Sequence, residues 1–195
     1  MFQDQPPTNF THHFLIAMPG LEDEGFSKSV VYMCEHSERG ALGLVINKPS
    51  DINLKKLFEK VDLPLDRRDL SDAPVFQGGP VQTERGFVLH ESMMPGLEAV
   101  YASTMSIPGG LEMTTSKDVL EALSSGNGPK KVFVSLGYSA WGEGQLESEI
   151  SDNSWLTVAA DIAVIFDTPV EERYAKAMGL LGLESWMLSP DAGHA

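Results

Sequence analysis

The stretch that decides the fold is VVYMCEHSERGALGLVI, residues 30–46. Two runs rich in apolar and β-branched residues, Val30 to His36 and Ala41 to Ile46, lie on either side of a short polar loop that ends at Gly40. Such runs around a short loop with a final glycine are typical of an antiparallel hairpin. We therefore expect two neighbouring antiparallel strands at this point of the chain.

More strands are predicted on both sides of this hairpin. Upstream, His13 to Met18 is a compact apolar run that Pro19-Gly20 ends, which indicates a buried strand. Downstream, short apolar runs bounded by glycine or proline predict strands at Val75 to Gln77, Phe87 to His90, Leu97 to Ser103, Leu111 to Met113 and Lys131 to Leu136.

Helices are predicted where the apolar residues change their spacing. In Asp51 to Val61 they fall at i, i+3, i+4 and i+7, which predicts a helix with Ser50 or Asp51 as its N-cap. Further helices are expected at Thr115 to Leu123 (with Thr115 and Asp118 at capping-box spacing and Gly126 as the C-terminal cap), at Glu143 to Ile150, and from Thr168-Pro169 to about Leu180.

Strands joined by short loops, with helices between them, favour a mixed α/β (α+β) fold over a doubly wound parallel sheet. We expect a single domain built on a mainly antiparallel mixed sheet, or on a partly closed barrel, flanked by helices. Its predicted bounds are residues 12–188, after a loose N-terminal arm at residues 1–11 and before a C-terminal tail at residues 189–195.

Length and composition agree with one globular domain. The chain has 195 residues, of which 42% are hydrophobic and 22% charged. The single cysteine, Cys34, excludes an intramolecular disulfide and favours a reducing compartment. No apolar run is long enough to predict a signal peptide or a membrane span, so the expected location is the cytoplasm.

Charge argues against direct binding of nucleic acid. The chain carries 28 acidic and 14 basic residues, a formal net charge of -14. Lys55, Lys56 and Lys60 lie on one predicted helix, but acidic residues stand among them and no second helix follows at helix-turn-helix spacing. The other basic residues are scattered and form no basic stripe. Proteins that bind duplex DNA neutralise its phosphates with clustered Lys and Arg. We therefore expect that this protein does not bind duplex DNA directly.

Cys34-Glu35-His36 is the first group of residues that could carry chemistry. On a regular strand Cys34 and His36 would point to one face, roughly 6.5 Å apart along the chain, too far for a direct thiolate–imidazole hydrogen bond. One cysteine and one histidine also leave a zinc ion short of ligands. The favoured interpretation is a small buried thiol beside a structurally bonded histidine, with no metal and no cofactor.

Residues 137–144 follow one predicted strand and precede a predicted helix, which is the position of phosphate-binding loops. Gly137 and Gly142 have Walker spacing, but Glu143 stands where the lysine belongs, and a carboxylate competes with phosphate at a helix N-terminus. The favoured interpretation is a glycine-rich turn over which Tyr138 and Trp141 cover apolar surface. The alternative is a platform for a ligand.

Two further strings, Asn47-Lys48-Pro49 and Gly78-Gly79-Pro80, are typical of backbone turns.

Many strings together resemble one family: FLIAMP at 14–19, SVVY at 29–32, GLVINKP at 43–49, GGPV at 78–81, RGFVLH at 85–90, TSKD at 115–118, LGY at 136–138, GQLE at 144–147 and FDTP at 166–169. They are similar to the bacterial YqgE/AlgH family from about Phe14 to the C-terminus. The resemblance implies a cytoplasmic protein with one α/β domain that contains a barrel-like sheet, and it implies no particular reaction.

The leading functional hypothesis is a non-enzymatic module that binds a protein partner or a small ligand, with regulatory consequences. The candidate binding residues are Cys34, His36, Asn47, Gly79, His90, Tyr138 and Trp141. The alternative is an enzyme whose site is built from Cys34, His36, His90 and the Tyr138–Trp141 segment. Convergence of these groups in one pocket would favour the enzyme, and their dispersal would favour the binding module.

Overall fold

The computed structural model describes residues 9–19, 26–93 and 99–182. Its strands are β1 (His13–Ala17), β2 (Val30–Ser37), β3 (Gly40–Val45), β4 (Pro49–Asn53), β5 (Pro74–Gln77), β6 (Val81–Glu91), β7 (Thr104–Ile107), β8 (Leu111–Thr114), β9 (Val132–Trp141) and β10 (Trp155–Ala159). Its α-helices are α1 (Leu54–Lys60), α2 (Asp118–Ser124), α3 (Gln145–Ser151), α4 (Ile162–Phe166) and α5 (Arg173–Leu180), with short 3-10 turns at Arg68–Leu70 and Val170–Glu172.

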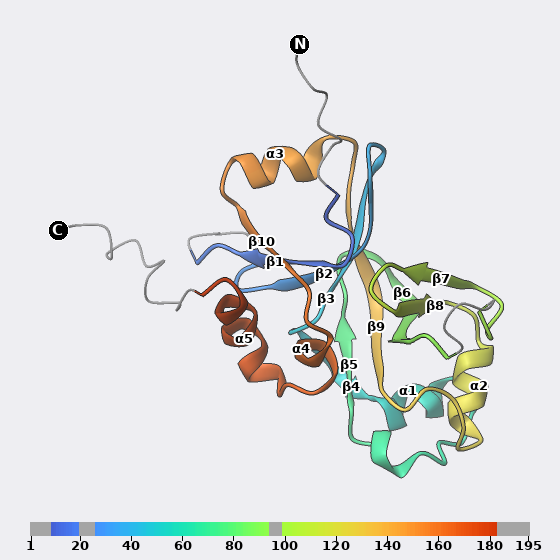
Figure 1. Ribbon diagram of the computed structural model, residues 1–195. Helices are drawn as coiled ribbons and strands as arrows, with labels where there is room; N and C mark the ends of the chain where they lie inside the picture. The colour runs from blue at the N-terminus through green and yellow to red at the C-terminus, as the bar shows by residue number, and fades with distance from the viewer. Residues whose placement is uncertain (1–8, 20–25, 94–98, 183–195) are drawn as a thin grey trace.

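The strands form one curled, half-barrel sheet in a single mixed α/β domain, as predicted. Their order is β10-β1-β2-β3-β9-β6-β8-β7, and every neighbouring pair along this path is antiparallel (Figure 1). Beside this path, β4 pairs with β5, and β5 pairs with β9 in parallel. The predicted hairpin of β2 and β3 is confirmed, with Ser37 opposite Gly40 at its turn.

Strand β9 joins the two halves of the sheet. Its residues up to Tyr138 pair with β6 and, in the middle, with β5, and its last three residues pair with β3, Ala41 lying opposite Trp141. Figure 1 shows β9 running from the α1 and α2 side of the molecule to the α3 side. The predicted loop at residues 137–141 is therefore wrong, because these residues continue the strand. Pairing with β3, nearly a hundred residues earlier in the chain, decides this, and no local pattern reports it.

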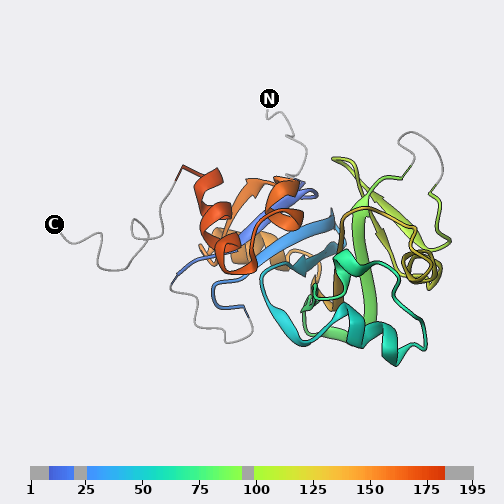
Figure 2. The same cartoon turned by 90° about the horizontal axis from the view of Figure 1, so that it is seen from below.

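Three clusters of buried side chains cover the two faces of the sheet. The first lies on one face, under α4 and α5, and includes Phe14, Tyr32 and Leu89. The second lies on the opposite face under α1 and α2 and includes Phe58 and Val88. The third lies under α3 and includes Leu146 with the two indoles of Trp141 and Trp155. Figure 2 shows α5 over β1 and β2, at a distance from α1 on the other half.

The helix predicted over Asp51 to Val61 begins later than expected. Residues up to Asn53 form β4, because Pro49 lies opposite Phe76 of β5. Asn53 then caps α1, its Oδ1 accepting from the Lys56 amide at 2.9 Å, so neither Ser50 nor Asp51 is the cap. The predicted apolar face is confirmed by Leu54 and Phe58, both buried.

Tertiary contacts also set other boundaries. Helix α2 begins at Asp118 rather than Thr115. In place of the predicted capping box with Thr115, the Asp118 carboxylate accepts hydrogen bonds from the Ser116 hydroxyl and the Ala102 amide. Gly126 follows α2 with φ +86, which agrees with its predicted role at the helix C-terminus. Of the strand predicted at 97–103, residues 99–103 are not a strand and residues 97–98 lie outside the described residues; β7 begins at Thr104. Strands β4, β7 and β10 and helix α4 were not predicted.

The domain bounds stay a prediction, since the tail at 189–195 lies outside the described residues. Of the predicted arm, residues 9–11 are described, and there Phe10 and Thr11 contact β2. None of the described helices is both long and apolar enough to cross a membrane.

Candidate functional site

A β-bulge separates Cys34 from His36. The pairing of β2 with β3 shifts register between Met33 and Glu35, so that Cys34 is an extra residue on its strand. An extra residue reverses the alternation of side chains along the strand. Cys34 therefore belongs to the first core cluster with Tyr32, while His36 lies opposite Ala41, which packs on the third cluster. The expectation that the two side chains share a face is wrong.

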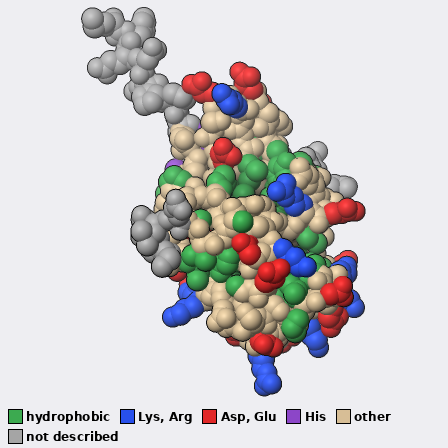
Figure 3. All heavy atoms as spheres, turned by 90° about the vertical axis from the view of Figure 1, so that its right-hand side faces the viewer, with side chains coloured by type: hydrophobic (Ala, Val, Ile, Leu, Met, Phe, Trp, Pro, Cys, Tyr) green, Lys and Arg blue, Asp and Glu red, His purple; other side chains and the backbone are tan. Residues whose placement is uncertain are grey.

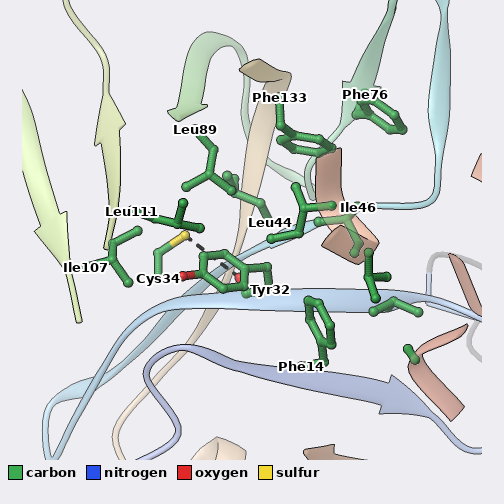
Figure 4. Packing of buried hydrophobic residues seen from close by; sticks show 14 of the residues in the cluster. Phe14, Tyr32, Cys34, Leu44, Ile46, Phe76, Leu89, Ile107, Leu111 and Phe133 are labelled. Carbon is green, nitrogen blue, oxygen red and sulfur yellow. Dashed lines mark hydrogen bonds between the residues drawn. The ribbon is translucent and has the colours of Figure 1, made fainter. Parts of the chain in front are cut away.

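Cys34 lies in packed hydrocarbon. Its side chain is 2% exposed, and its thiol donates a weak hydrogen bond to the Tyr32 carbonyl at 3.8 Å. Figure 4 shows the sulfur between Leu111, Ile107 and the ring of Tyr32. Burial, with a smaller contribution from Glu35, raises the pKa of the Cys34 thiol far above its ordinary value. The thiolate that a nucleophile or redox sensor needs is strongly disfavoured there.

His36 ties the N-terminal residues and α3 to the end of β2. The Phe10 amide donates to Nδ1 of His36 at 2.9 Å, and the Phe10 ring stacks on the imidazole. Since Nδ1 accepts, Nε2 carries the proton and donates to Oε1 of Glu147 at 2.6 Å. This hydrogen bond lowers the pKa of the Glu147 carboxyl. Both ring nitrogens of His36 are thus engaged in structural hydrogen bonds.

His90 lies in a different part of the molecule, on β6. It is fully buried, with Nδ1 donating to the Glu91 carbonyl at 2.9 Å and Nε2 bonded to Oγ1 of Thr114 at 2.8 Å. The Tyr101 ring packs edge-on against the imidazole. Tyr101 belongs to the second cluster, so Cys34, His36 and His90 lie in three separate places.

Tyr138 and Trp141 lie apart, although only two residues separate them on β9. Tyr138 packs edge-on against Phe87 on the first cluster, while Trp141 is 5% exposed in the third. The Trp141 and Trp155 indoles both donate to Oε1 of Glu149, at 3.3 and 3.1 Å. Trp141 thus covers apolar surface, as the favoured interpretation expected, and Tyr138 does the same on the other side.

Asn47 and Gly79 shape the backbone at two turns. Asn47 Oδ1 accepts from the Val30 amide, and its Nδ2 donates to the Lys28 carbonyl, which fixes the start of β2. At Gly79 a Cβ atom would overlap the backbone of Tyr138 and Ser139, so only glycine lets this turn approach β9. Both turns border the pocket described next.

A pocket of about 670 Å³, here named the Lys48 pocket, lies between these turns. It is lined by Phe26, Val45, Lys48, Ser50, Gln77, Gly79, Pro80, Thr83 and Leu136. Five of these residues come from the ends of β3 and β5, from β4, from the middle of β9 and from a segment of β6 that leaves the sheet. The other four lie in connections: Phe26 before β2, Lys48 before β4, and Gly79 and Pro80 between β5 and β6. The volume is in the range of small-molecule sites.

The segment of β6 that leaves the sheet is Gln82–Arg85. Val81 pairs with Tyr138 and Gly86 with Leu136, so four exposed residues of β6 stand opposite a single residue, Gly137. Thr83 of this bulge forms a wall of the Lys48 pocket. A bulge that re-aims side chains beside a pocket is a recurrent feature of binding sites.

The lining is mainly apolar and holds one charge. Phe26, Val45, Pro80 and Leu136 supply hydrocarbon walls. Lys48 as a residue is half-buried, and its ammonium donates to the Ser27 carbonyl at 2.8 Å. None of the described lining residues is Asp, Glu, His or Cys, so this described part of the wall offers no ordinary general base.

The described ranges also lack a cluster of side chains that could bind a metal ion. In residues 9–19, 26–93 and 99–182, no three His, Cys, Asp or Glu side chains come close enough to hold an ion. On the face drawn in Figure 3, acidic and basic side chains are interspersed.

Of the sequence candidates, Gly79 lies in the pocket and Asn47 adjoins it, whereas Cys34, His36, His90, Tyr138 and Trp141 are not among its lining residues. The sequence patterns did not identify the lining residues Phe26, Lys48, Gln77 and Thr83 as parts of one site. The signal that could have found part of it was the lysine inside the turn string Asn47-Lys48-Pro49, since lysine is mostly exposed and Lys48 is half-buried.

Comparisons with known proteins agree on one family. The family model described as DUF179, AlgH-like, matches residues 14–186. A UPF0301 protein of Polaromonas is 85% identical over 195 residues, and one of Variovorax paradoxus is 75% identical over 199; each match covers 100% of both chains. The solution structure of the AlgH protein from Pseudomonas aeruginosa, also UPF0301, is 48% identical with a TM-score of 0.76, covering 100% of both chains. A crystal structure from Corynebacterium diphtheriae, 21% identical over 91% of this chain and 88% of its own with a TM-score of 0.67, shares the fold.

Proposed function

The chain belongs to the AlgH-like family, and from that premise we propose that it is a cytoplasmic, non-enzymatic binding module whose Lys48 pocket takes a small ligand. Binding of that ligand would have regulatory consequences through a protein partner, and would not involve direct contact with DNA.

The observation that carries this proposal is the composition of the pocket wall. A site of about 670 Å³ with apolar walls, one lysine and a few neutral polar side chains can hold and orient a molecule. It offers no carboxylate, imidazole or thiol among its described residues to move a proton or attack a substrate. Recognition without chemistry is the function that such a wall supports best.

Dispersal of the other candidates supports the same conclusion. An enzyme built from Cys34, His36 and His90 needs these groups within hydrogen-bond reach of one substrate. They belong instead to three separate regions, and each imidazole is already bonded on both nitrogens. Nothing in this arrangement favours the enzyme alternative.

Direct DNA binding is disfavoured by charge. The lysines of α1 stand on a helix of seven residues, and the chain as a whole carries a net charge of -14. Counterion release from DNA needs a cluster of cations that faces the phosphates. A regulatory effect would therefore pass through a ligand or a second protein.

The test is to purify the protein from bacterial cytosol and record native mass spectra for bound small molecules. Thr83→Trp places an indole in the pocket from an exposed bulge residue, and Glu84→Trp is the matched control because Glu84 does not line the pocket. We expect a bound molecule on the wild type and on Glu84→Trp, and its loss from Thr83→Trp at unchanged melting temperature. A bound molecule that survives Thr83→Trp, or none on the wild type, would refute the proposal.

A further inference from the structure

We infer that the ligand of the Lys48 pocket is a small monocarboxylic acid with an apolar body, its carboxylate held by the Lys48 ammonium. This inference rests on the proposed function and specifies the chemistry of that site.

The charge of the described lining indicates that the ligand is negatively charged. Acidic residues outnumber basic residues 28 to 14 over the chain, yet the described lining holds one lysine and no acid. The ion pairs within the described residues are His36–Glu147, Arg67–Asp69 and Lys131–Asp167, and Lys48 is in none of them. A single cation in a mainly apolar lining attracts an anion, and an anionic ligand would supply the opposite charge that the described lining lacks.

Within the described residues, the Lys48 ammonium has one hydrogen-bond partner, the Ser27 carbonyl at 2.8 Å. An ammonium carries three N–H donors, and the described residues use one of them, so the two oxygens of a ligand carboxylate could accept from the other two. The Ser27 bond meanwhile holds the side chain in place and reduces the entropy lost when a ligand binds.

The magnitude of the charge favours a monoanion. Lys48 is the one cation in the described lining, and it balances one negative charge. A phosphate monoester approaches two negative charges near neutral pH and would leave most of the second uncompensated beside apolar walls. A carboxylate matches the single lysine.

The remaining walls define the rest of the ligand. Phe26 and Pro80 offer flat apolar faces, and Val45 and Leu136 close the hydrocarbon surface. Gln77 and Thr83 are exposed residues of the lining, so the Gln77 amide and the Thr83 hydroxyl can bond to polar groups of the ligand. An aromatic or branched aliphatic acid has the required combination.

The experiment measures the affinity of four probes by calorimetry: 3-phenylpropionate, 3-phenylpropanol, 3-phenylpropylamine and phenyl phosphate. They share a phenyl ring and differ in charge. We expect 3-phenylpropionate to bind most tightly, and Lys48→Met to weaken it by roughly tenfold or more, the usual effect of losing a charged hydrogen bond. Lys48→Arg keeps the charge and should retain most of the affinity. Lys55→Met, on the exposed surface of α1, is the control and should change nothing.

Each outcome decides the inference. Equal affinity for 3-phenylpropanol and 3-phenylpropionate, with no effect of Lys48→Met, would overturn the carboxylate while leaving a ligand-binding pocket. Tighter binding of phenyl phosphate would overturn the monoanion. If none of the four binds at millimolar concentration, the inference fails, whereas the proposed function is judged separately by the molecule that co-purifies with the protein. Should Lys48→Met fail to fold, the wild-type ranking and the blocked Thr83→Trp variant still decide.

Discussion

Replacing Trp141 by alanine tests whether this part of β9 is core or binding surface. The indole is 5% exposed and packs near the rings of Trp155 and Phe26, with centroids 6.1 and 6.4 Å away. Truncation of a buried tryptophan costs about 3–5 kcal/mol, which includes the cavity it leaves. The lost Nε1 hydrogen bond adds little, because Glu149 keeps its bond from the Trp155 indole at 3.1 Å.

The assay is urea unfolding followed by fluorescence and circular dichroism. A loss of about 3–5 kcal/mol corresponds to a fall of about 6–20 °C in the melting temperature for a chain of this length. Trp141→Phe keeps most of the buried surface and should cost about 1–2 kcal/mol. Leu180→Ala is the control: that side chain is 39% exposed, and its truncation should change stability by less than about 0.5 kcal/mol. A Trp141→Ala variant within about 1 kcal/mol of the wild type would refute the core assignment.

Cys34→Ala should cost about 1 kcal/mol and the folded protein should react with a thiol reagent far more slowly than a free peptide thiol, because the side chain is 2% exposed; labelling at the peptide rate would contradict this. The His36 hydrogen bond lowers the pKa of Glu147 below its ordinary 4.5 in the folded state, so it stabilises the fold at neutral pH and that contribution fades as the pH falls below about 4.5. Urea titrations from pH 7 to pH 3 should show the difference between wild type and Glu147→Gln shrink toward the acid end, and a difference independent of pH would be the contrary result. Fluorescence anisotropy with a labelled promoter duplex should show no sequence-selective binding by the protein alone at physiological salt, because the chain has a net charge of -14. Nanomolar, sequence-selective binding would contradict the conclusion that the protein does not bind DNA directly.

The hairpin and the helix faces could be read from sequence because their causes are local. The β2–β3 pair is set by a short polar connection between two apolar runs, and the apolar face of α1 by the i, i+4 spacing of Leu54 and Phe58. The cap was misplaced by two or three residues, because the choice between Ser50, Asp51 and Asn53 depends on how far β4 stays paired with β5.

The errors at β2 and β9 have one physical origin. Alternation along a strand assumes one residue opposite one residue, and the bulge at Cys34 breaks that count where β3 pairs with β2. The glycines near residue 137 likewise indicated a turn, although Gly137, with φ +77, lies within a strand opposite the β6 bulge. In both cases a partner strand distant in sequence decides the local conformation.

By itself, the sequence determined the family, the mixed α/β class, the acidic charge and the elements whose periodicity is local, because these depend on residue type and short spacing. Tertiary structure alone decided which groups meet. The fold places Cys34, His36 and His90 in three separate regions. It forms the Lys48 pocket from segments between residues 26 and 136. The physical reason is that hydrogen bonding between strands and burial of their two faces set the position of each side chain, and both depend on contacts between residues far apart in the chain.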